Sequence, residues 1–202
     1  MTGGYESGYA ACSCFWGTEP GSLVRDLLAL TKVAGLRVLD AGCGEGKNSI
    51  ALAKEGATVN AMDSSALAID HARRMSTNLS GIAYSLGDVR TANFSPESFD
   101  VVLAYGLLHC LSSEREVSDV LRRLQAATAS DGFFVLCAFN DRYQELEAHP
   151  GFSPTTMKHD WYEEMFSDWT LLRCFDSDLT EVHPHNGIRH SHSMTRILAR
   201  KG

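Results

Sequence analysis

The sequence predicts a doubly wound α/β fold with a mostly parallel sheet, and three observations carry this prediction. Short apolar runs alternate with amphipathic segments from residue 36 to residue 139. A turn with glycine at every second position follows the first apolar run, in VLDAGCGEGKNS (residues 38–49). The pattern changes in the last quarter, where a turn at Asn186-Gly187 leads into a final strand. Strands that alternate with helices form right-handed crossovers, which place the strands parallel.

The segments can be assigned in order from their periodicity. The first is an amphipathic helix over residues 18–32, with Thr18 as its N-cap and Pro20 near its first turn. Strands are then expected at residues 36–41, 58–62, 82–85, 99–105 and 132–139, and helices at residues 47–54, 64–76 and 113–130.

The last quarter has a different organisation. Residues 160–166 (DWYEEMF) favour a helix, and residues 169–176 favour a strand. The turn at Asn186-Gly187 then reverses the chain, so the sheet is expected to end in an antiparallel hairpin.

Length and charge restrict the organisation and the partners. A chain of 202 residues, 44% of them hydrophobic, predicts one domain over residues 1–202, with residues 1–32 as an N-terminal lid and helix. The formal net charge of -7 and the absence of a long basic run disfavour a nucleic acid partner.

The location in the cell follows from what the sequence lacks. Neither a signal peptide nor an apolar run of membrane-spanning length is present, which predicts a cytoplasmic protein with no membrane partner. The six cysteines show no CxxC spacing and are expected to be reduced. The oligomeric state is left open.

The glycine turn is the first sign of a ligand site. Gly42, Gly44 and Gly46 let the backbone approach a ligand and direct the N–H groups of the following helix toward it. The spacing does not fit a phosphate-binding P-loop, and the dinucleotide motif requires glycine where Lys47 stands. The turn is therefore expected to bind a ligand that ends in an amino acid.

Two aspartates after later strands extend this site. Asp63 lies about 20 residues past the turn, where a carboxylate can accept both ribose hydroxyls. Asp88 follows the third strand, where it can accept an adenine amino group. Taken alone, each has an ordinary structural explanation, as a helix cap for Asp63 and as a turn residue for Asp88.

With these elements in register, the chain resembles the class I S-adenosylmethionine-dependent methyltransferases over about residues 15–200. The resemblance implies a Rossmann-like sheet of seven strands and S-adenosylmethionine as the cofactor. It places Asp40 and Gly42 beside the methionine moiety, Asp63 at the ribose, and Asp88 with Val89 at the adenine. The complete expected cofactor set is Asp40, Gly42, Gly44, Gly46, Asn48, Asp63, Ser64, Asp88, Val89 and Tyr105.

Two longer stretches narrow the resemblance. GCGEGKNSIALAKEGATVNAMDSS (residues 42–65) and SMTRILARKG (residues 193–202) are similar to the tellurite-resistance methyltransferase family. That similarity implies that His183 and Arg189 approach the acceptor and serve as catalytic residues. Residues 104–109 (AYGLLH) lack the Asn/Asp-Pro-Pro-aromatic run of enzymes that methylate nucleic acid bases.

The C-terminal turn departs from that family because it is short and rich in histidine, with His185, His190 and His192. His190 and His192 share one strand face, and a metal site with His183 or His185 is an alternative. No carboxylate or cysteine stands at ligand spacing in the sequence, so the prediction is that no metal is bound. His190 and His192 are expected to contact the substrate instead.

Four further residues are expected to line the substrate side. Phe15 and Trp16 form either a lid over the cofactor or a hydrophobic staple for the first helix. His109 is either a general base or a core histidine, and Tyr105 is expected to face the transferred methyl group. A metalloid site at Cys12 and Cys14 is disfavoured because no third ligand is near.

The sequence therefore predicts a methyltransferase that acts on a small molecule, either a tellurite-type oxyanion or a metabolite with a nitrogen, oxygen or sulfur nucleophile. An alternative is a non-catalytic module that senses S-adenosylmethionine. The two differ in one observable, the acceptor-dependent release of S-adenosylhomocysteine.

Overall fold

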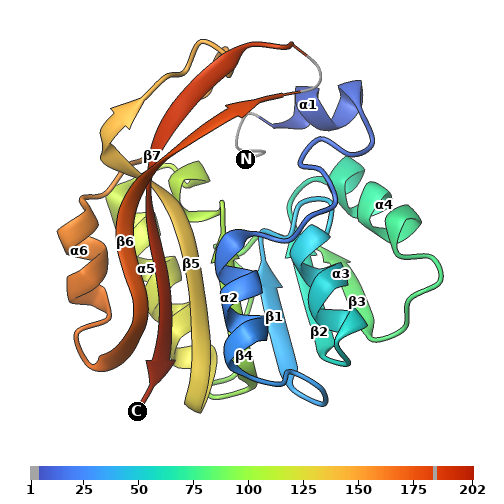
Figure 1. The fold of residues 1–202 in the computed structure, drawn as a ribbon, viewed down its shortest axis with the longest axis vertical. Coiled ribbons are helices and arrows are strands. Elements are labelled where there is room, and N and C mark those ends of the chain that lie inside the picture. Colours follow the sequence, from blue (N-terminus) through green and yellow to red (C-terminus); the bar gives the residue numbers. More distant parts are fainter. Residues whose placement is uncertain (1–4, 184–185) are drawn as a thin grey trace.

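A computed structural model describes residues 5–183 and 186–202, and it is built around one sheet of seven strands in the order β3-β2-β1-β4-β5-β7-β6 (Figure 1). The strands are β1 (Arg37–Ala41), β2 (Thr58–Asp63), β3 (Ile82–Leu86), β4 (Phe99–Tyr105), β5 (Thr128–Gln144), β6 (Trp169–Val182) and β7 (Arg189–Lys201). The helices are α1 (Glu6–Ala11), α2 (Ser22–Leu30), α3 (Lys47–Lys54), α4 (Ala66–Met75), the 3-10 helix η1 (Leu108–Cys110), α5 (Glu114–Ala127) and α6 (His159–Met165).

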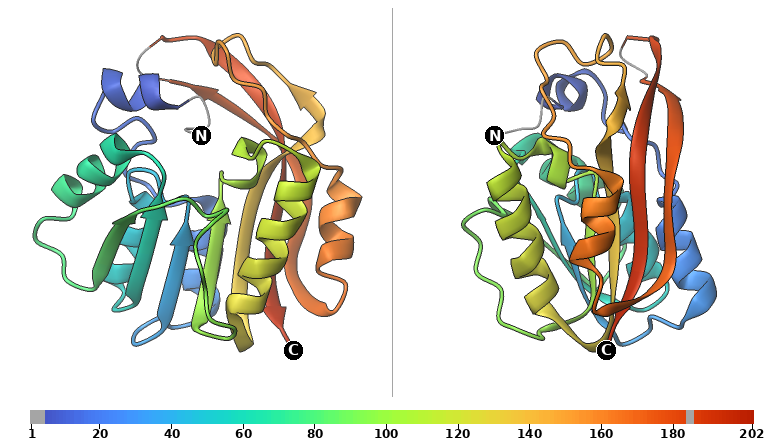
Figure 2. Two further views of the ribbon diagram at one scale, coloured as in Figure 1. Left: turned by 180° about the vertical axis from the view of Figure 1, so that it is seen from behind. Right: turned by 90° about the vertical axis from the view of Figure 1, so that its left-hand side faces the viewer.

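The first five strands are parallel, as predicted. Such a sheet must bury both faces, and β4 does so with four consecutive fully buried residues (101–104). One face packs on α2, α3 and α4 through Leu27, Leu52 and Ile69, and the other packs on α5 and α6 through Leu121 and Tyr162 (Figure 2). The doubly wound α/β prediction is confirmed.

The antiparallel end is also confirmed, but it is longer than predicted. β7 lies between β5 and β6 and pairs antiparallel with both. The chain reverses near Gly187, whose φ of 65° lies in the left-handed region that favours glycine. β6 and β7 span 14 and 13 residues, and their far ends curve over the carboxyl ends of the parallel strands toward α1 (Figure 1).

The beginning of the chain differs most from the prediction. The helix expected from residue 18 begins at Ser22, with Gly21 rather than Thr18 at its N-cap. The Gly21 N–H donates to Asn48 Oδ1 at 2.9 Å, and a Cβ at this glycine would lie 2.3 Å from the Tyr105 ring. This close approach holds the preceding residues out of the helix.

Two other sequence expectations can be compared with the structure. All six cysteines are free, which agrees with the prediction of reduced thiols. Among the helices formed by residues 5–183 and 186–202, none combines the length and the apolar character that a membrane crossing requires.

The central strand β4 is the element whose packing we expect stability to depend on most. Leu103→Ala should destabilise the fold by about 2–5 kcal/mol, because Leu103 is fully buried and its loss leaves a cavity. Chemical denaturation monitored by circular dichroism measures this change. Leu86→Ala is the matched control, because Leu86 is 59% exposed, and it should change stability by less than about 0.5 kcal/mol. Equal effects of the two substitutions would contradict the assigned core.

Candidate functional site

A pocket of about 480 Å³ opens at the carboxyl ends of β1, β2 and β4, a volume typical of small-molecule sites. Ten of the residues predicted for the cofactor or substrate line it: Trp16, Gly42, Gly44, Asn48, Asp63, Ser64, Asp88, Val89, Tyr105 and His109. Seven others do not line it: Phe15, Asp40, Gly46, His183, Arg189, His190 and His192.

The glycine turn between β1 and α3 forms the floor of this pocket. Gly42, Gly44 and Gly46 have φ of 71°, 54° and 80°, in the left-handed region. A Cβ at Gly42 would lie 2.8 Å from Leu107 Cδ1, and a Cβ at Gly46 would lie 2.7 Å from Tyr84 Oη. The turn is therefore fixed by both backbone conformation and close packing.

Asp63 at the end of β2 supports the turn from the side. Its Oδ2 accepts from the Gly44 N–H at 2.8 Å and its Oδ1 accepts from the Ser65 N–H at 2.9 Å. Burial raises the pKa of this carboxyl, while the backbone N–H groups lower it. The carboxylate lines the pocket, and its oxygens keep lone pairs for further donors.

Asp88 faces the pocket as half of an ion pair. Its carboxylate accepts from the Arg90 N–H at 2.9 Å and from the Arg90 guanidinium at 2.5–3.0 Å. These hydrogen bonds lower the pKa of Asp88 and keep it ionised. Arg90 therefore uses some of the lone pairs of the Asp88 carboxylate that were expected to accept an adenine amino group.

Asp40 on β1 lies below the turn and is 1% exposed. Its Oδ2 accepts from Ser49 Oγ at 2.6 Å, whereas its Oδ1 is buried with no hydrogen-bond partner among the described residues. Burial raises the pKa of Asp40 to about 6. A charged oxygen without a partner is energetically costly when buried, so burial favours the protonated form of this carboxyl.

The N-terminal segment covers the glycine turn. The Trp16 N–H donates to Glu45 Oε2 at 3.2 Å, and Lys47 Nζ donates to the Trp16 carbonyl at 3.3 Å. Glu45 is itself 2% exposed and lies 2.9 Å from His71 Nδ1. Trp16 thus lines the pocket, while Phe15 lies behind it and stacks on His183 with ring centroids 4.6 Å apart.

His109 from η1 reaches the pocket wall as a neutral imidazole. Its Nδ1 accepts from the Phe139 N–H at 3.2 Å, its Nε2 lies 3.3 Å from Tyr5 Oη, and its ring stacks on Phe139 with centroids 3.8 Å apart. Burial lowers the pKa of His109 to about 3. This environment favours a core histidine over a general base, because a base works best with a pKa near the working pH.

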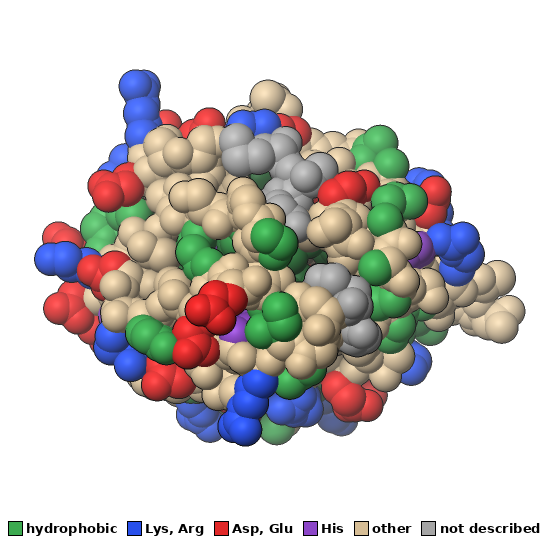
Figure 3. All heavy atoms as spheres, turned by 90° about the horizontal axis from the view of Figure 1, so that it is seen from above, with side chains coloured by type: hydrophobic (Ala, Val, Ile, Leu, Met, Phe, Trp, Pro, Cys, Tyr) green, Lys and Arg blue, Asp and Glu red, His purple; other side chains and the backbone are tan. Residues whose placement is uncertain are grey.

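The far side of the pocket is formed by β5, β6 and β7. Phe139, Leu179 and Met194 give it an apolar wall, and Glu181 and Arg196 add one charge of each sign. Figure 3 looks onto this end of the molecule, where Lys and Arg side chains lie mainly at the margin and alternate with Asp and Glu.

The catalytic residues expected from the tail lie outside the pocket lining. His183 is 2% exposed and packs among other histidines, while the Arg189 side chain is exposed. His190 and His192 are buried in the same histidine cluster. His185 lies outside the described residues, and the roles predicted for His183 and Arg189 remain predictions.

Several residues that the fold brings to the site carry no signal in the sequence. Glu45 stood in the quoted glycine motif, but its partners Trp16 and His71 lie 26 or more residues away. Arg90 pairs with Asp88, and nothing in the local sequence showed that this carboxylate would be shared with a guanidinium. His149, Glu181 and Arg196 lie in segments that read as ordinary strand and loop. The resemblance of the tail to a known family drew attention to His183 and Arg189 instead.

Comparison with known proteins places this geometry in a family context. Residues 38–132 match the family model described as a methyltransferase domain. The chain is 27% identical over 173 residues to the probable S-adenosyl-L-methionine-dependent methyltransferase TehB of Haemophilus influenzae, covering 84% of this chain and 58% of that protein. The chain spans roughly 37–58% of the length of the first curated relatives it matches.

Solved structures show the same fold. The crystal structure of TehB from Haemophilus influenzae superposes with a TM-score of 0.75 at 23% identity, over 90% of this chain and 62% of that chain. The structure titled "Conversion of a Disulfide Bond into a Thioacetal Group during Echinomycin Biosynthesis" superposes with a TM-score of 0.74 at 22% identity. The match covers 100% of this chain and 92% of that chain. Magnesium protoporphyrin IX methyltransferase of Synechocystis PCC 6803 with bound SAM superposes with a TM-score of 0.66 at 18% identity. The match covers 98% of this chain and 80% of that chain.

The buried Asp40 predicts a specific pH dependence of stability. Its folded-state pKa of about 6 lies above the ordinary aspartate value of 3.8, so the folded state binds more protons than the unfolded state between these values. Its contribution to stability is therefore largest at low pH and is lost as the pH rises through about 6.

Asp40→Asn should remove this loss. Relative to the unsubstituted protein, the variant should gain about 2 kcal/mol of stability between pH 4.5 and pH 7, measured by urea unfolding without ligand. Asp70→Asn is the control, because the Asp70 side chain is 62% exposed. A stability difference that does not change with pH would show that Asp40 is ionised in the fold at both values.

Proposed function

From the resemblance of this chain to the class I S-adenosylmethionine-dependent methyltransferases of the tellurite-resistance type, we propose that it transfers a methyl group from S-adenosylmethionine to a small molecule. The observation that carries the proposal is the pocket floor, where the glycine turn and Asp63 face the same cavity.

Each end of the pocket has a chemical preference that supports this assignment. Gly42 and Gly44 let the backbone of the turn approach the amino acid end of the cofactor, with Asp40 buried behind the turn, and Asp63 suits the ribose hydroxyls. Asp88 and Val89 suit the adenine, with Arg90 holding the Asp88 carboxylate in place.

The chemistry itself makes modest demands on the protein. When bound, S-adenosylmethionine supplies the methyl group from its sulfonium, which becomes a neutral thioether as the acceptor's lone pair attacks in line. The protein's contribution is to align the acceptor and exclude water. Trp16 and Tyr105 line the pocket from opposite segments of the chain and are suited to that exclusion.

For the acceptor, we propose a small metabolite with an apolar part and an anionic or polar group. Phe139, Leu179 and Met194 provide the apolar contact, and Arg196 provides the cation that an oxyanion or a carboxylate requires. Arg196 is only 8% exposed and donates to the Ser177 side chain, so its orientation is fixed. A tellurite-type oxyanion would use the same cation.

The direct test is calorimetric titration with S-adenosylmethionine and S-adenosylhomocysteine, with NADH as the control ligand. Micromolar binding of the first two alone supports the proposal and justifies an acceptor screen that begins with tellurite, thiols, amines and phenols. Binding without acceptor-dependent formation of S-adenosylhomocysteine would favour a sensor module. A folded protein that binds neither ligand would refute the proposal.

Substitution of Asp63 tests the cofactor site. Asp63→Asn should weaken S-adenosylmethionine binding by about 1–3 kcal/mol, through loss of charge-assisted hydrogen bonds to the ribose. Asn is preferable to Ala because the carboxylate also holds the Gly44 and Ser65 N–H groups, and removing both acceptors would loosen the turn. Asp70→Asn should bind normally in calorimetry, and unchanged affinity of Asp63→Asn would contradict the ribose assignment.

Substitution of Arg196 tests the acceptor site. Arg196→Gln should raise the KM for an anionic acceptor by roughly tenfold or more, because a charge-assisted hydrogen bond is lost, and should change cofactor affinity little. Arg200→Gln on the same strand is the matched control, since Arg200 is exposed and pairs with Asp131 at the opposite end of the sheet. Equal steady-state kinetics of the two variants would place the acceptor elsewhere.

A further inference from the structure

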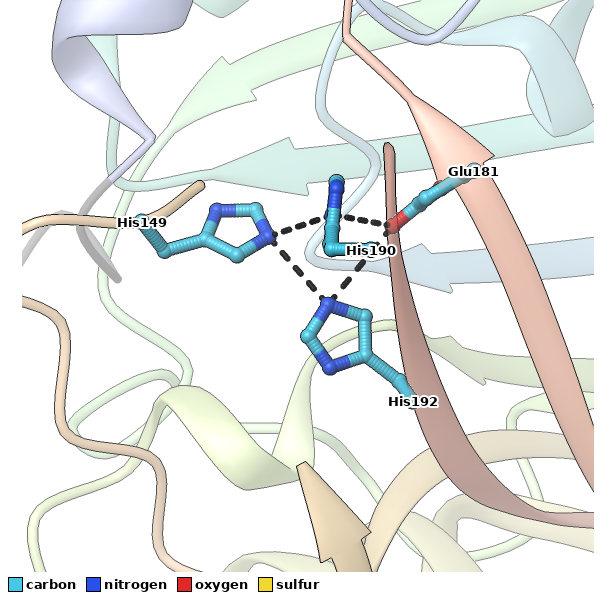
Figure 4. Close-up of side chains that lie close together, drawn as sticks. All are labelled: His149, Glu181, His190 and His192. Atoms are coloured by element: carbon cyan, nitrogen blue, oxygen red, sulfur yellow. Dashed lines mark hydrogen bonds and ion pairs between the residues drawn. The ribbon is translucent and has the colours of Figure 1, made fainter. Parts of the chain in front are cut away.

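Four side chains from three separate segments meet beside the pocket, at the far end of the β6–β7 hairpin. Glu181 on β6 is paired directly with His190 on β7, and His192 lies two residues further on the same face. His149 comes from the segment between β5 and α6. Figure 4 shows the three imidazole rings and the carboxylate pointing toward one another.

The distances between the donor atoms match those around a small metal ion. His149 Nε2 lies 3.1 Å from His190 Nε2 and 3.3 Å from His192 Nε2. Imidazole nitrogens at 2.0–2.1 Å from a tetrahedral zinc ion are separated by about 3.3 Å. Glu181 Oε1 lies 3.6 Å from His190 Nε2 and 4.0 Å from His192 Nε2, so all four donor atoms lie within 4.8 Å of one another.

In two of the rings the Nδ1 atom, which points away from the cluster, is hydrogen-bonded to an oxygen, as is usual for histidines that bind a metal through Nε2. His190 Nδ1 lies 2.9 Å from the Ile188 carbonyl, and His192 Nδ1 lies 2.8 Å from Gln144 Oε1. Both partners are acceptors, so each Nδ1 carries the proton and each Nε2 directs a lone pair to the centre of the cluster.

Protons alone do not account for this arrangement. His149 Nε2 faces the Nε2 atoms of His183, His190 and His192 at 3.1–3.3 Å, and a single N–H can donate to only one of them at full strength. The three histidines that share the cluster with Glu181 are 0–6% exposed, so the cluster is shielded from water. One divalent cation accepts the lone pairs of His149, His190 and His192 together.

We propose that His149, Glu181, His190 and His192 bind a divalent transition metal of the zinc class. Three imidazole nitrogens and one carboxylate oxygen are ligands that Zn²⁺ accepts, and four protein ligands are typical of a closed, structural site. His183 lies beside this set, with its Nε2 3.7 Å from Glu181 Oε1. The sequence favoured no metal because no carboxylate or cysteine stands at ligand spacing near the tail histidines, and only the fold brings Glu181 and His149 to them.

The position of the site gives it a structural role. The metal cross-links the end of the hairpin to the segment that contains His149 and, through rings packed on the cluster, to the N-terminal segment. Tyr5 packs on His149 with ring centroids 5.7 Å apart, and Phe15 stacks on His183. Because Glu181 also lines the pocket, the metal fixes the wall on the acceptor side.

The test uses the full chain without an affinity tag and in the absence of cofactor, so its outcome is independent of the proposed methyl transfer. Metal removed with a chelator is replaced by Zn²⁺ or Co²⁺ in an equilibrium titration with elemental analysis. We expect one ion per chain, a Co²⁺ absorption spectrum typical of four-coordination, and a rise in Tm of about 5–10 °C at a hundredfold excess over Kd.

His192→Gln and Glu181→Gln should each reduce the affinity for Zn²⁺ by at least tenfold, whereas Ser191→Ala should not change it. Ser191 is the matched control because it lies between two ligands and points to the opposite face of β7. A folded, unsubstituted protein that binds neither ion in a one-to-one ratio would overturn the proposal, without reference to any variant. Equal affinity of His192→Gln and Ser191→Ala would overturn it as well.

Discussion

The carboxylate of Asp63 is the interaction on which the geometry of the site depends. It joins the end of β2 to the glycine turn after β1 through the Gly44 N–H, and to the start of α4 through the Ser65 N–H. Neighbouring parallel strands end at the same edge, so one side chain at that edge can fix two connections. Its burial raises the pKa, and the two N–H groups stabilise its ionised form.

The cover of the pocket depends on a second buried carboxylate, Glu45, which belongs to the turn itself. It accepts from the Trp16 N–H and lies against His71 of α4, so the N-terminal segment is fastened to the floor that it covers. Lys47 adds a bond to the Trp16 carbonyl from the position where a dinucleotide site has its third glycine. The same short turn therefore shapes the floor and anchors the cover.

The local sequence pattern predicted correctly those helices and strands that depend on residues close to one another in the sequence. The bounds of α3 and β4 agree with the prediction, since burial periodicity and glycine punctuation act within one segment. The contacts of Gly21 with Tyr105 and of His149 with His190 join residues 41 or more positions apart, and no local signal encodes them. Family resemblance drew attention to the glycine turn and Asp63, which line the pocket, because those motifs are local, and it did not draw attention to Leu179, Glu181 or Arg196 on the opposite wall.

The length of the hairpin explains why a polar cluster lies where a hydrophobic core is expected. β7 pairs with β5 continuously from Phe133 to Phe139 and then only at Gln144, so the far end of the hairpin extends beyond the body of the sheet. This far end packs on the N-terminal segment and on the segment that contains His149. The two hydrophobic clusters found there are small, and such clusters bury too little apolar surface to hold a hairpin by themselves. Ligand bonds to one ion provide the cross-link that a larger core provides elsewhere. The proposed metal keeps Glu181 in register with the glycine turn, although the two are 135 or more residues apart in sequence.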